Sequence, residues 1–507
     1  MPLDNKWDVV IVGSGISSLS AALLLGKEAG KKVCILESHS QYGGYLHSFK
    51  RFGKRFDTGA HYVGAMGEDG QFRALLKYLD VFDEKIFVKL DDGFDNIKGA
   101  DFEFVIPTGY KNFENKLIAN FPSDKNGIKE FLQIIREVVK VFPSYNFGAK
   151  LNFSAFKEAT ETSLGSVVEK LIKSPNLKII LYSYCALHGV SPHDISIGMH
   201  ALILDGLIRG AYGFRNGGDK LADNFAQKIR SFGGEVFCNK KVVALNTSDG
   251  KVISAELENG QKVHGDIFIS GADPHSTYKL FDQSILKAGR KNRIKKLNYT
   301  QGVLGIYAKV NKSLGLNTRK NYYCFNSKDP NHLVSPISES TQIKAAFFSP
   351  TSRVSDAEST TDAIAIFGQI PEGLFEKWKG DKNYSTDSEY IDTKTQLANK
   401  TLKFVDQFFP NFSRSVMKFS TSTPLTNIRY NPSVSGAPYG IYHSMSQTGI
   451  RSLSNKTQFE NFFLTGQSTL MPGLLGACLS GFHTVDHLLD LEQILIGVKS
   501  LWRNTNE

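Results

Sequence analysis

The sequence contains few cysteines and no pattern that pairs them. Its five cysteines are scattered along 507 residues, and no two of them form a C-x-x-C motif. This usage argues against a disulfide framework and favours a reduced compartment. The sequence also shows no metal-ligand spacing, no Ser/His/Asp triad, no phosphate-binding P-loop and no paired carboxylates at a useful spacing. We therefore expect no metal centre.

Long apolar runs are also missing. No run reaches the roughly 18 residues that a membrane-spanning helix needs. The first predicted strand starts at residue 8, which leaves no room for a signal or transit peptide. We expect a cytoplasmic protein that is peripherally associated with membranes, lying on the surface of any membrane that it meets.

The charge is unbalanced, but no nucleic-acid motif accompanies it. The formal net charge is +10 and the pI is near 9.0. Lysine and arginine are scattered, apart from short clusters such as residues 290–296. A solvated helix face or a membrane-facing patch explains such clusters better than nucleic acid does, so we expect no nucleic-acid partner.

The remaining composition is that of an ordinary globular protein. Hydrophobic residues make up 41% of the chain and charged residues 22%. A chain of 507 residues exceeds what one compact core usually holds. The length therefore predicts two domains.

Residues 7–37 have the pattern of a strand, a glycine turn, a helix and a second strand. Residues 8–12 are apolar on both faces and rich in β-branched side chains, as in a strand buried within a parallel sheet. The turn at residues 13–18 opens a helix over residues 19–29, and a second strand follows at residues 32–36. The pattern predicts a βαβ unit.

The glycine turn has the chemistry of a dinucleotide site. Gly13 permits the tight turn, and Gly15 lets a pyrophosphate approach the helix N-terminus, where free N–H groups favour an anion. Glu37 ends the second strand, where its carboxylate can accept hydrogen bonds from a ribose. The third glycine position holds Ser18, and we expect this small side chain to widen the helix packing slightly without removing the site. An ordinary glycine turn that binds nothing would not need Glu37.

Further motifs follow along the chain. Gly43 and Gly44 let the backbone pass close to a phosphate or sugar, and residues 56–62 read F-D-T-G-A-H-Y. Near the C-terminus a predicted strand runs into Gly466, and a helix starts near Gly476. The free N–H groups of that helix would face a negatively charged group.

In this order, the motifs resemble those of the flavin-dependent family of phytoene desaturases, carotenoid isomerases and retinol saturases. Residues 56–62 are most similar to the retinol saturases, and the resemblance runs over nearly the whole chain. It implies FAD rather than NAD as the cofactor, because the C-terminal element is similar to the one that faces the flavin ring in this fold. Many relatives carry arginine after the double glycine, whereas this chain has Tyr45, which leaves open the phosphate contact of that arginine.

The resemblance implies an α/β fold, with a Rossmann-like FAD/NAD(P)-binding domain of a GR2-type flavoprotein and a discontinuous α+β substrate domain. It assigns residues 1–70, 206–275 and 421–507 to the FAD-binding domain, and residues 71–205 and 276–420 to the substrate-binding cap. The residues that it assigns to the cofactor come from both ends of the chain and its middle. They are Gly13, Ser14, Gly15, Ile16, Ser17, Glu37, Ser38, Gly43, Gly44, Tyr45, His61, Val242, Gly466, Gln467, Leu475, Gly476 and Ala477.

His61 has two interpretations. The fold of the family brings this turn close to the flavin, so His61 is a candidate to hydrogen-bond the ring or to give a proton to a substrate carbon. A histidine here is equally compatible with a structural role in holding the loop. Both interpretations stay open at this point.

The resemblance predicts an FAD-dependent oxidoreductase that acts on a C=C bond of an apolar polyene or isoprenoid lipid, such as a retinoid or carotenoid, by hydride transfer through flavin N5. Saturation leads because of residues 56–62. Desaturation and cis–trans isomerisation are alternatives, since one fold hosts all three outcomes. A flavin-free prenyl-lipid carrier similar to the Rab GDP-dissociation inhibitors is a second alternative, which Glu37 and the double glycine disfavour. An amine oxidase of the same superfamily is a third, and the electron donor or acceptor is unknown.

Overall fold

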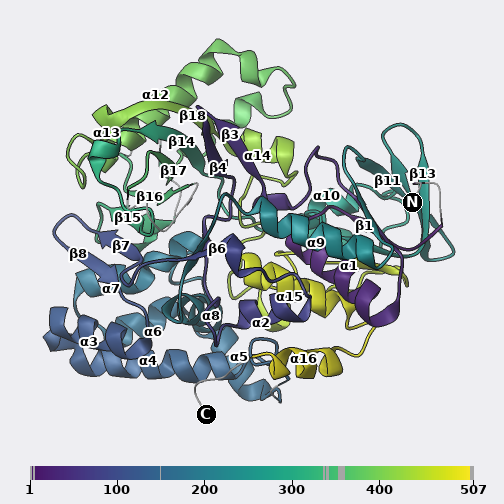
Figure 1. Cartoon of the computed structure of the whole chain (residues 1–507), viewed down its shortest axis with the longest axis horizontal. Helices are drawn as coiled ribbons and strands as arrows, with labels where there is room; N and C mark the ends of the chain where they lie inside the picture. Colours follow the sequence, from purple (N-terminus) through teal and green to yellow (C-terminus); the bar gives the residue numbers. More distant parts are fainter. Residues whose placement is uncertain are drawn as a thin grey trace.

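Two seven-stranded sheets organise the chain, one on each side of Figure 1. The computed structural model describes residues 3, 6–148, 150–334, 337–338, 342–351 and 360–502. Parts of the predicted domain ranges, at both termini, at residue 149 and within residues 276–420, therefore lie outside the described residues.

The first sheet is built around β1 (Trp7–Val12), and it contains the expected βαβ unit. α1 (Ile16–Ala29) links β1 to β2 (Val33–Leu36), and these two strands pair in parallel. Val9, Val10 and Ile11 are fully buried, which confirms a strand covered on both faces. The helix begins three residues before the predicted start, because Gly15 already takes the N-cap position. The other strands of this sheet are β10 (Glu235–Phe237), β11 (Val242–Ser248), β12 (Lys251–Leu257), β13 (Lys262–Ser270) and β19 (Phe462–Leu464).

The second sheet draws on two separate parts of the chain. All its neighbouring strands pair antiparallel except β7 and β15, which run parallel. In order, its strands are β18 (Val416–Ser422), β14 (Leu304–Val310), β17 (Ala363–Gly368), β16 (Ala345–Pro350), β15 (Asn321–Phe325), β7 (Asp95–Lys98) and β8 (Glu103–Ile106).

Two small sheets lie where the chain passes from one large sheet to the other. One is the hairpin of β3 (Ser48–Arg51) and β4 (Lys54–Asp57). In the other, β9 (Tyr212–Phe214) is the central strand between β5 (Tyr62–Val63) and β6 (Phe87–Lys89). β5 contains the last residue of the F-D-T-G-A-H-Y motif, so this motif ends at the boundary between the two large sheets.

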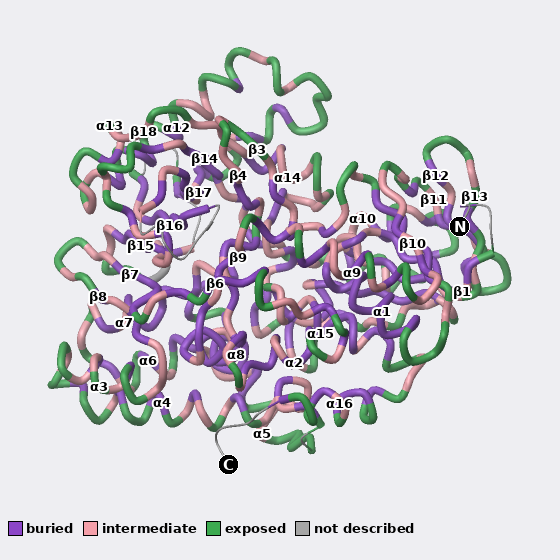
Figure 2. Tube along the Cα trace, in the orientation of Figure 1, coloured by how far each residue is buried: buried purple, intermediate pink, exposed green. Residues whose placement is uncertain are grey.

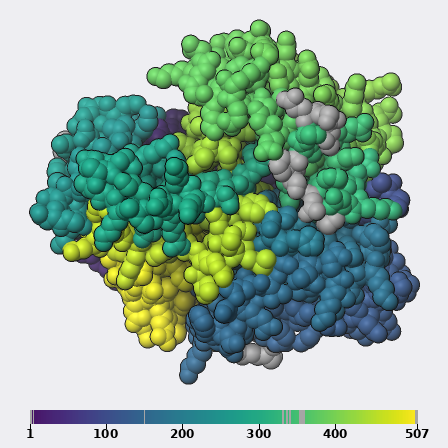
Figure 3. All heavy atoms as spheres, turned by 180° about the vertical axis from the view of Figure 1, so that it is seen from behind, coloured from purple at the N-terminus to yellow at the C-terminus, as the bar shows by residue number. Residues whose placement is uncertain are grey.

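The helices complete the layers. α8 (Ile197–Ile208) is apolar on nearly every side, and Figure 2 shows it as a buried segment, as expected for such a helix. From behind, yellow-green residues of the C-terminal part of the chain lie against blue ones (Figure 3). The short 3-10 helix at Gly449–Arg451 contacts residues 153–161 there. The other helices are α2 (Gln71–Tyr78), α3 (Tyr110–Asn120), α4 (Lys125–Lys140), α5 (Phe153–Glu161), α6 (Leu164–Leu171), α7 (Pro175–Tyr182), α9 (Asp219–Ser231), α10 (Pro274–Tyr278), α11 (Ala288–Lys295), α12 (Ser388–Val405), α13 (Phe412–Ser415), α14 (Pro424–Tyr430), α15 (Leu474–Val485) and α16 (Leu491–Ser500).

This arrangement confirms the predicted α/β class, with a Rossmann-like sheet beside a second, discontinuous unit of sheet and helices. Within the residues that the structure describes, no helix combines the length and apolar character needed to cross a membrane.

Candidate cofactor site

The N-terminus of α1 is buried, and no side chain in the described part of the chain caps it. Gly13, with φ of +86°, turns the backbone out of β1. Ile16 and Ser17 are only 5% and 3% exposed, and the first turn contains no acidic residue. A Cβ on Gly15 would meet nothing within 4 Å, so there is room beside these N–H groups. A buried, uncapped helix start of this kind fits an anion.

Glu37 braces this turn in addition to ending β2. Its Oε2 accepts hydrogen bonds from the Ser14 backbone N–H at 3.0 Å and from the Ser14 hydroxyl at 2.5 Å. Its Oε1 accepts from the His39 N–H at 2.8 Å and from the Ser38 hydroxyl at 3.3 Å. The carboxylate is thus held beside the glycine turn, where the sequence predicts a ribose partner. The tether to Ser14 is a second role that the motif did not indicate.

The double glycine lies directly against the first turn of α1. Gly43 donates its N–H to the Ser14 carbonyl at 3.1 Å, and a Cβ on Gly44 would lie 3.2 Å from the Cα of Gly15. Both glycines have positive φ, +110° and +58°, which only glycine adopts at little cost. The two glycine turns therefore form one surface, named here the glycine surface and made of residues 13–17 and 43–45.

Tyr45, which stands where many relatives carry arginine, packs its ring on a neighbouring turn. A Cβ on Gly59 would lie 2.7 Å from the Tyr45 ring, so the ring rests against the turn that carries the F-D-T-G-A-H-Y motif. Its hydroxyl is buried. Burial raises the pKa of this hydroxyl to about 12. Tyr45 therefore stays neutral at physiological pH and supplies no positive charge to a phosphate.

His61 lies between the glycine surface and the second sheet. Its turn is tied to the double-glycine segment by the hydrogen bond from the Ala60 N–H to the Tyr45 carbonyl, at 3.2 Å. His61 is 8% exposed, and its ring centroid lies 4.8 Å from that of Phe367 and 6.4 Å from that of Phe347. These two aromatic rings belong to β17 and β16, so His61 joins the two large units of the fold.

The predicted C-terminal element packs on α1. The Gly466 N–H donates to the Ser480 hydroxyl at 2.9 Å, and a Cβ on Gly466 would lie 3.7 Å from the Ser17 Oγ. A Cβ on Gly481 would lie only 2.5 Å from the Ser17 carbonyl oxygen. α15 and α1 therefore cross in direct backbone contact, which small residues permit.

α15 begins with a second uncapped N-terminus. Its N-cap residue, Gly473, has φ of +85° and no side-chain cap, and the first turn holds no acidic residue. A Cβ on Gly473 would meet nothing within 4 Å, whereas one on Gly476 would lie 2.1 Å from the Met471 Cγ. Leu475, Gly476 and Ala477 thus form the start of a helix with room at its positive end.

Val242 and Gln467 are the two remaining residues that the sequence predicts to contact the cofactor. Val242 begins β11, just after Lys240 donates its N–H to the Glu37 carbonyl at 2.7 Å. Gln467 follows the C-terminal glycine, and its carbonyl oxygen lies 2.9 Å from Nε2 of the buried His443. The contacts above join the glycine surface to Glu37, to the turn that carries His61 and to Gly466, whereas Val242, Gln467 and the start of α15 are connected to this group along the chain.

Sequence reasoning missed two neighbours of the glycine turn. A Cβ on Gly271 would lie 2.1 Å from the Ser18 Oγ, so a serine fits at the third glycine position because residue 271 is a glycine. Asp273, two residues later, accepts at Oδ1 from the Ser276 N–H and the Tyr299 hydroxyl, both at 3.2 Å. Burial raises the Asp273 pKa to about 6. Its sequence signal is its position three residues after β13 ends. β13 pairs in parallel with β1, and ligands bind beyond the carboxyl ends of the strands in such sheets.

We expect the variant Asp273→Asn to remove a pH-dependent loss of stability. The carboxyl pKa is about 6 in the folded chain and about 3.9 when unfolded. Folding is therefore favoured by this group below pH about 4, and that contribution is lost as the pH rises through about 6. The free energy of unfolding of wild type should therefore fall by about 2 kcal/mol more than that of the variant when the pH is raised from 4 to 7.5. Urea unfolding at both pH values measures it, and an unchanged difference would contradict it.

A buried cluster of Cys185, His188 and His200 has the spacing of metal ligands, with candidate ligand atoms within 4.8 Å of one another. His188 Nδ1 accepts the Val190 N–H at 3.3 Å, and its Nε2 lies 3.4 Å from Nδ1 of His200. A neutral imidazole that accepts at Nδ1 carries its proton on Nε2. His188 therefore donates to His200 and offers no lone pair to a metal, so the contacts favour a hydrogen-bonded pair.

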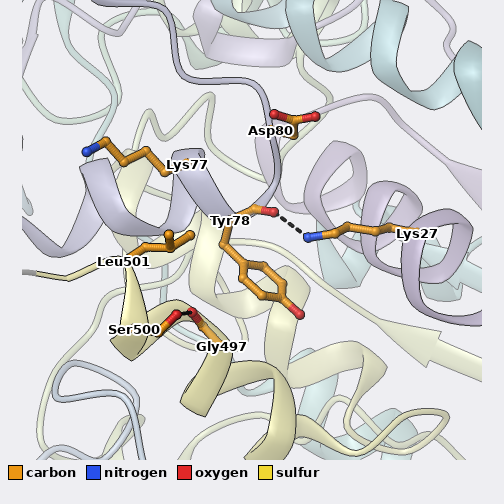
Figure 4. Close-up of a pocket in the computed structure, with 7 residues that line it drawn as sticks. All are labelled: Lys27, Lys77, Tyr78, Asp80, Gly497, Ser500 and Leu501. Carbon is orange, nitrogen blue, oxygen red and sulfur yellow. Dashed lines mark hydrogen bonds between the residues drawn. The ribbon is translucent and has the colours of Figure 1, made fainter.

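The pocket in Figure 4 belongs to a different part of the surface. Lys27, which donates to the Tyr78 carbonyl at 2.6 Å, lines it from the last turn of α1. That position is roughly 16 Å along the helix from Ile16. The pocket, about 360 Å³ in volume, is therefore separate from the candidate cofactor site.

Comparison with known proteins agrees with these features. Residues 16–489 match the model of a family described as flavin containing amine oxidoreductase. The chain is 27% identical to the all-trans-retinol 13,14-reductase of Danio rerio, over 93% of this chain and 84% of that protein. It is 23% identical to the chloroplastic prolycopene isomerase of Daucus carota, over 96% of this chain and 81% of that protein.

Among solved structures, an oxidoreductase from Methanosarcina mazei superimposes with a TM-score of 0.63 and 14% sequence identity. The match covers 94% of this chain and 100% of that one. At this identity the likeness shows the fold alone.

Proposed function

The chain belongs to the flavin containing amine oxidoreductase family, and from this premise we propose that it is an FAD-dependent oxidoreductase that saturates a C=C bond of a polyene lipid. The observation that carries the proposal is the pair of uncapped helix N-termini: that of α1, which is buried beside Glu37, and that of α15, which is partly exposed. This pair suits a ligand with a pyrophosphate at one end and a ring that gains negative charge at the other.

Each part of the surface has a proposed partner in FAD. The first turn of α1 and the double glycine hold the pyrophosphate, and Glu37 accepts from the ribose while it retains its bonds to Ser14. The backbone at Val242 borders the adenine, and the start of α15 faces the N1–C2=O edge of the isoalloxazine. When bound, FAD supplies hydride chemistry at N5. We also propose, as the resemblance implies, that residues 1–70, 206–275 and 421–507 form the FAD-binding domain. Residues 71–205 and 276–420 would form the substrate-binding cap.

The substrate class rests on the relatives and on the aromatic surface beside His61. The reductase relative is named for retinol, and the rings of Phe347 and Phe367 face His61 on the second sheet. Aromatic rings suit contact with a flat, conjugated chain. We propose a retinoid or carotenoid as substrate. A carotenoid isomerase or desaturase is the second candidate, favoured by the similarity to prolycopene isomerase.

The substrate would be delivered from a lipid surface, because a polyene is nearly insoluble in water. The net charge of +10 favours attraction to anionic headgroups. We therefore also propose that the protein binds peripherally to membranes. The experiment below tests both the reaction and this membrane binding.

We expect the purified protein to be yellow, with flavin absorption bands. After anaerobic reduction, a polyene presented in anionic liposomes should reoxidise the flavin and yield a product two hydrogens heavier. Unchanged mass with altered double-bond geometry would mean an isomerase. Absence of flavin after reconstitution would favour the lipid-carrier alternative, and failure to sediment with liposomes at low salt would contradict membrane contact.

A further inference from the structure

A second pocket, about 550 Å³ in volume, opens beside the small sheet of β5, β9 and β6. β9 and β6 lie between the two large sheets (Figure 2). None of the described residues that line this pocket belongs to the candidate cofactor site. Its volume falls within the range of about 300 to 1,000 Å³ that is usual for small-molecule sites. The pocket therefore has room for a ligand that the proposed function does not use.

Positive charge predominates on the walls of this pocket, which we name the basic pocket. Among the described residues that line it, the cationic ones are Arg73, Lys85, Lys89, Arg215 and Arg319, and the acidic ones are Asp83 and Glu84. Arg319 also lies near a third carboxylate, since its Nη1 is 3.8 Å from Oδ1 of Asp91. The cations still outnumber the acids, so the basic pocket favours an anionic ligand.

Arg73, on α2, is held in place but weakly neutralised. Its side chain is 16% exposed, and its guanidinium lies over the Phe82 ring, 4.8 Å from the centroid. Its Nη2 is 4.0 Å from Oε1 of Glu84, whose own side chain is 83% exposed. The buried Nε of Arg73 has no hydrogen-bond partner among the described residues. A guanidinium that is mostly buried and so weakly paired is unfavourable, and a bound anion would offset that cost.

The neighbouring backbone fixes the position of these walls. Tyr212 on β9 pairs in register with Lys89 on β6, and the Arg215 N–H donates to the Ile86 carbonyl at 2.7 Å. The Phe82 ring, which carries the Arg73 guanidinium, stacks on Phe87 with centroids 5.9 Å apart. The planar Arg73 group is therefore presented in one orientation, as two-point recognition of a phosphate or carboxylate requires.

Charge and volume distinguish between these anions. A phosphate monoester carries about −1.5 to −2 near pH 7, whereas a carboxylate carries a single charge. The further cations beside Arg73 favour the more highly charged group. Lys85 and Lys89 are exposed, so they attract such an anion from solution. The volume of about 550 Å³ exceeds what a free phosphate needs and admits a nucleotide.

We propose that the basic pocket binds a phosphate-bearing nucleotide, with Arg73 contacting its phosphate. This inference goes beyond the proposed function and does not depend on it, because neither FAD nor the polyene is assigned to these residues.

The test measures the affinity of ADP by calorimetry, with holoprotein freed of unbound FAD. Arg73→Met keeps the packing on Phe82 and removes the charge, so ADP affinity should fall at least about 10-fold. Added salt should weaken ADP binding to wild type. Arg136→Met is the matched control. Arg136 also lies over a ring, 4.7 Å from the Tyr110 centroid, but it does not line the basic pocket. This control should bind ADP as wild type does.

Further arms identify the location and the ligand. Gly15→Val blocks the glycine surface and should leave ADP affinity unchanged. Loss of ADP binding in Gly15→Val but not in Arg73→Met would place the nucleotide on the glycine surface and overturn the inference. Inorganic phosphate should bind more weakly than ADP. Equal affinity for the two, or Arg73-dependent binding of phosphatidylglycerol vesicles without ADP binding, would replace the nucleotide with a free anion or a lipid headgroup.

Thermal unfolding separates a binding role from a structural one. Because Arg73 is weakly paired, the midpoint of ligand-free Arg73→Met should equal or exceed that of wild type. Saturating ADP should raise the midpoint of wild type and not that of the variant. A lower midpoint together with wild-type ADP affinity would make Arg73 a structural residue and overturn the inference. If Arg73→Met does not fold, Lys89→Gln replaces it. The side chain of Lys89 is exposed, and unchanged ADP affinity in that variant would also contradict the inference.

Discussion

Gly15→Val should give a folded protein that purifies without flavin. A Cβ at residue 15 meets no atom within 4 Å, and the backbone there, with φ of −61° and ψ of 164°, is allowed for any residue. Folding should therefore lose no more than about 1 kcal/mol, from replacing a glycine N-cap. The same space is where the proposed pyrophosphate approaches the helix N-terminus. We expect FAD affinity to fall at least about 100-fold, or about 2.7 kcal/mol.

Flavin absorbance per protein and the thermal unfolding midpoint of the flavin-free form measure the two effects separately. Gly289→Val is the control, because a Cβ at residue 289 also meets nothing within 4 Å but lies on α11, outside the candidate site. Gly15→Ala should lie between wild type and valine. Full flavin content in Gly15→Val would show that no ligand occupies the space over α1.

Asp205→Ala should destabilise the protein by about 3 to 5 kcal/mol, because it removes one partner of a buried ion pair. Asp205 is fully buried and accepts from the Tyr110 hydroxyl at 2.7 Å, the Tyr145 hydroxyl at 2.8 Å and Nε of Arg209 at 2.8 Å. The substitution leaves two phenols and part of a guanidinium group without their acceptor. Asp69 still pairs with Arg209 at 2.9 Å, which keeps the loss within this range.

Chemical unfolding of the purified variant measures the loss. Glu460→Ala removes an exposed carboxylate from a surface pair with Lys251 and should change the free energy of unfolding by less than about 1 kcal/mol. An Asp205→Ala midpoint equal to that of this control would show that the buried pair contributes little. Flavin content should be unaffected in both variants once they are folded.

The βαβ unit shows how far local pattern reaches. Residues 8–12 read as a strand buried on both faces, and β1 is such a strand. The glycines at 13, 15, 43 and 44 predicted turns. In the structure, residues 13, 43 and 44 have positive φ, and residue 15 is the N-cap of α1. These features depend on neighbours within a few residues, so a single sequence can reveal them.

Other features of the candidate site depend on contacts between segments that are far apart in the chain, and the sequence did not predict them. Ser18 is acceptable because Gly271 faces it, and Glu37 is tied to Ser14 across the turn. The resemblance named Gly466 and Gly476, but only the structure shows that α15 crosses α1 at Ser17. A local sequence pattern predicts whether a segment is a helix or a strand, but it does not predict how close two such segments lie in the fold.

By itself the sequence determined the class of fold and, through its resemblance, the family. It also predicted the glycine turns of the candidate cofactor site, because such turns, strand periodicity and helix starts depend on residues close together in the chain. Only the tertiary structure decided which side chains surround Asp95. The hydroxyls of Tyr62 and Tyr184 donate to Asp95, and the Tyr62 hydroxyl also lies 2.6 Å from that of Tyr323. These contacts join residues that are 33, 89 and 261 positions apart in the chain. No local pattern links such positions, since their contact depends on how β5, β7 and β15 assemble.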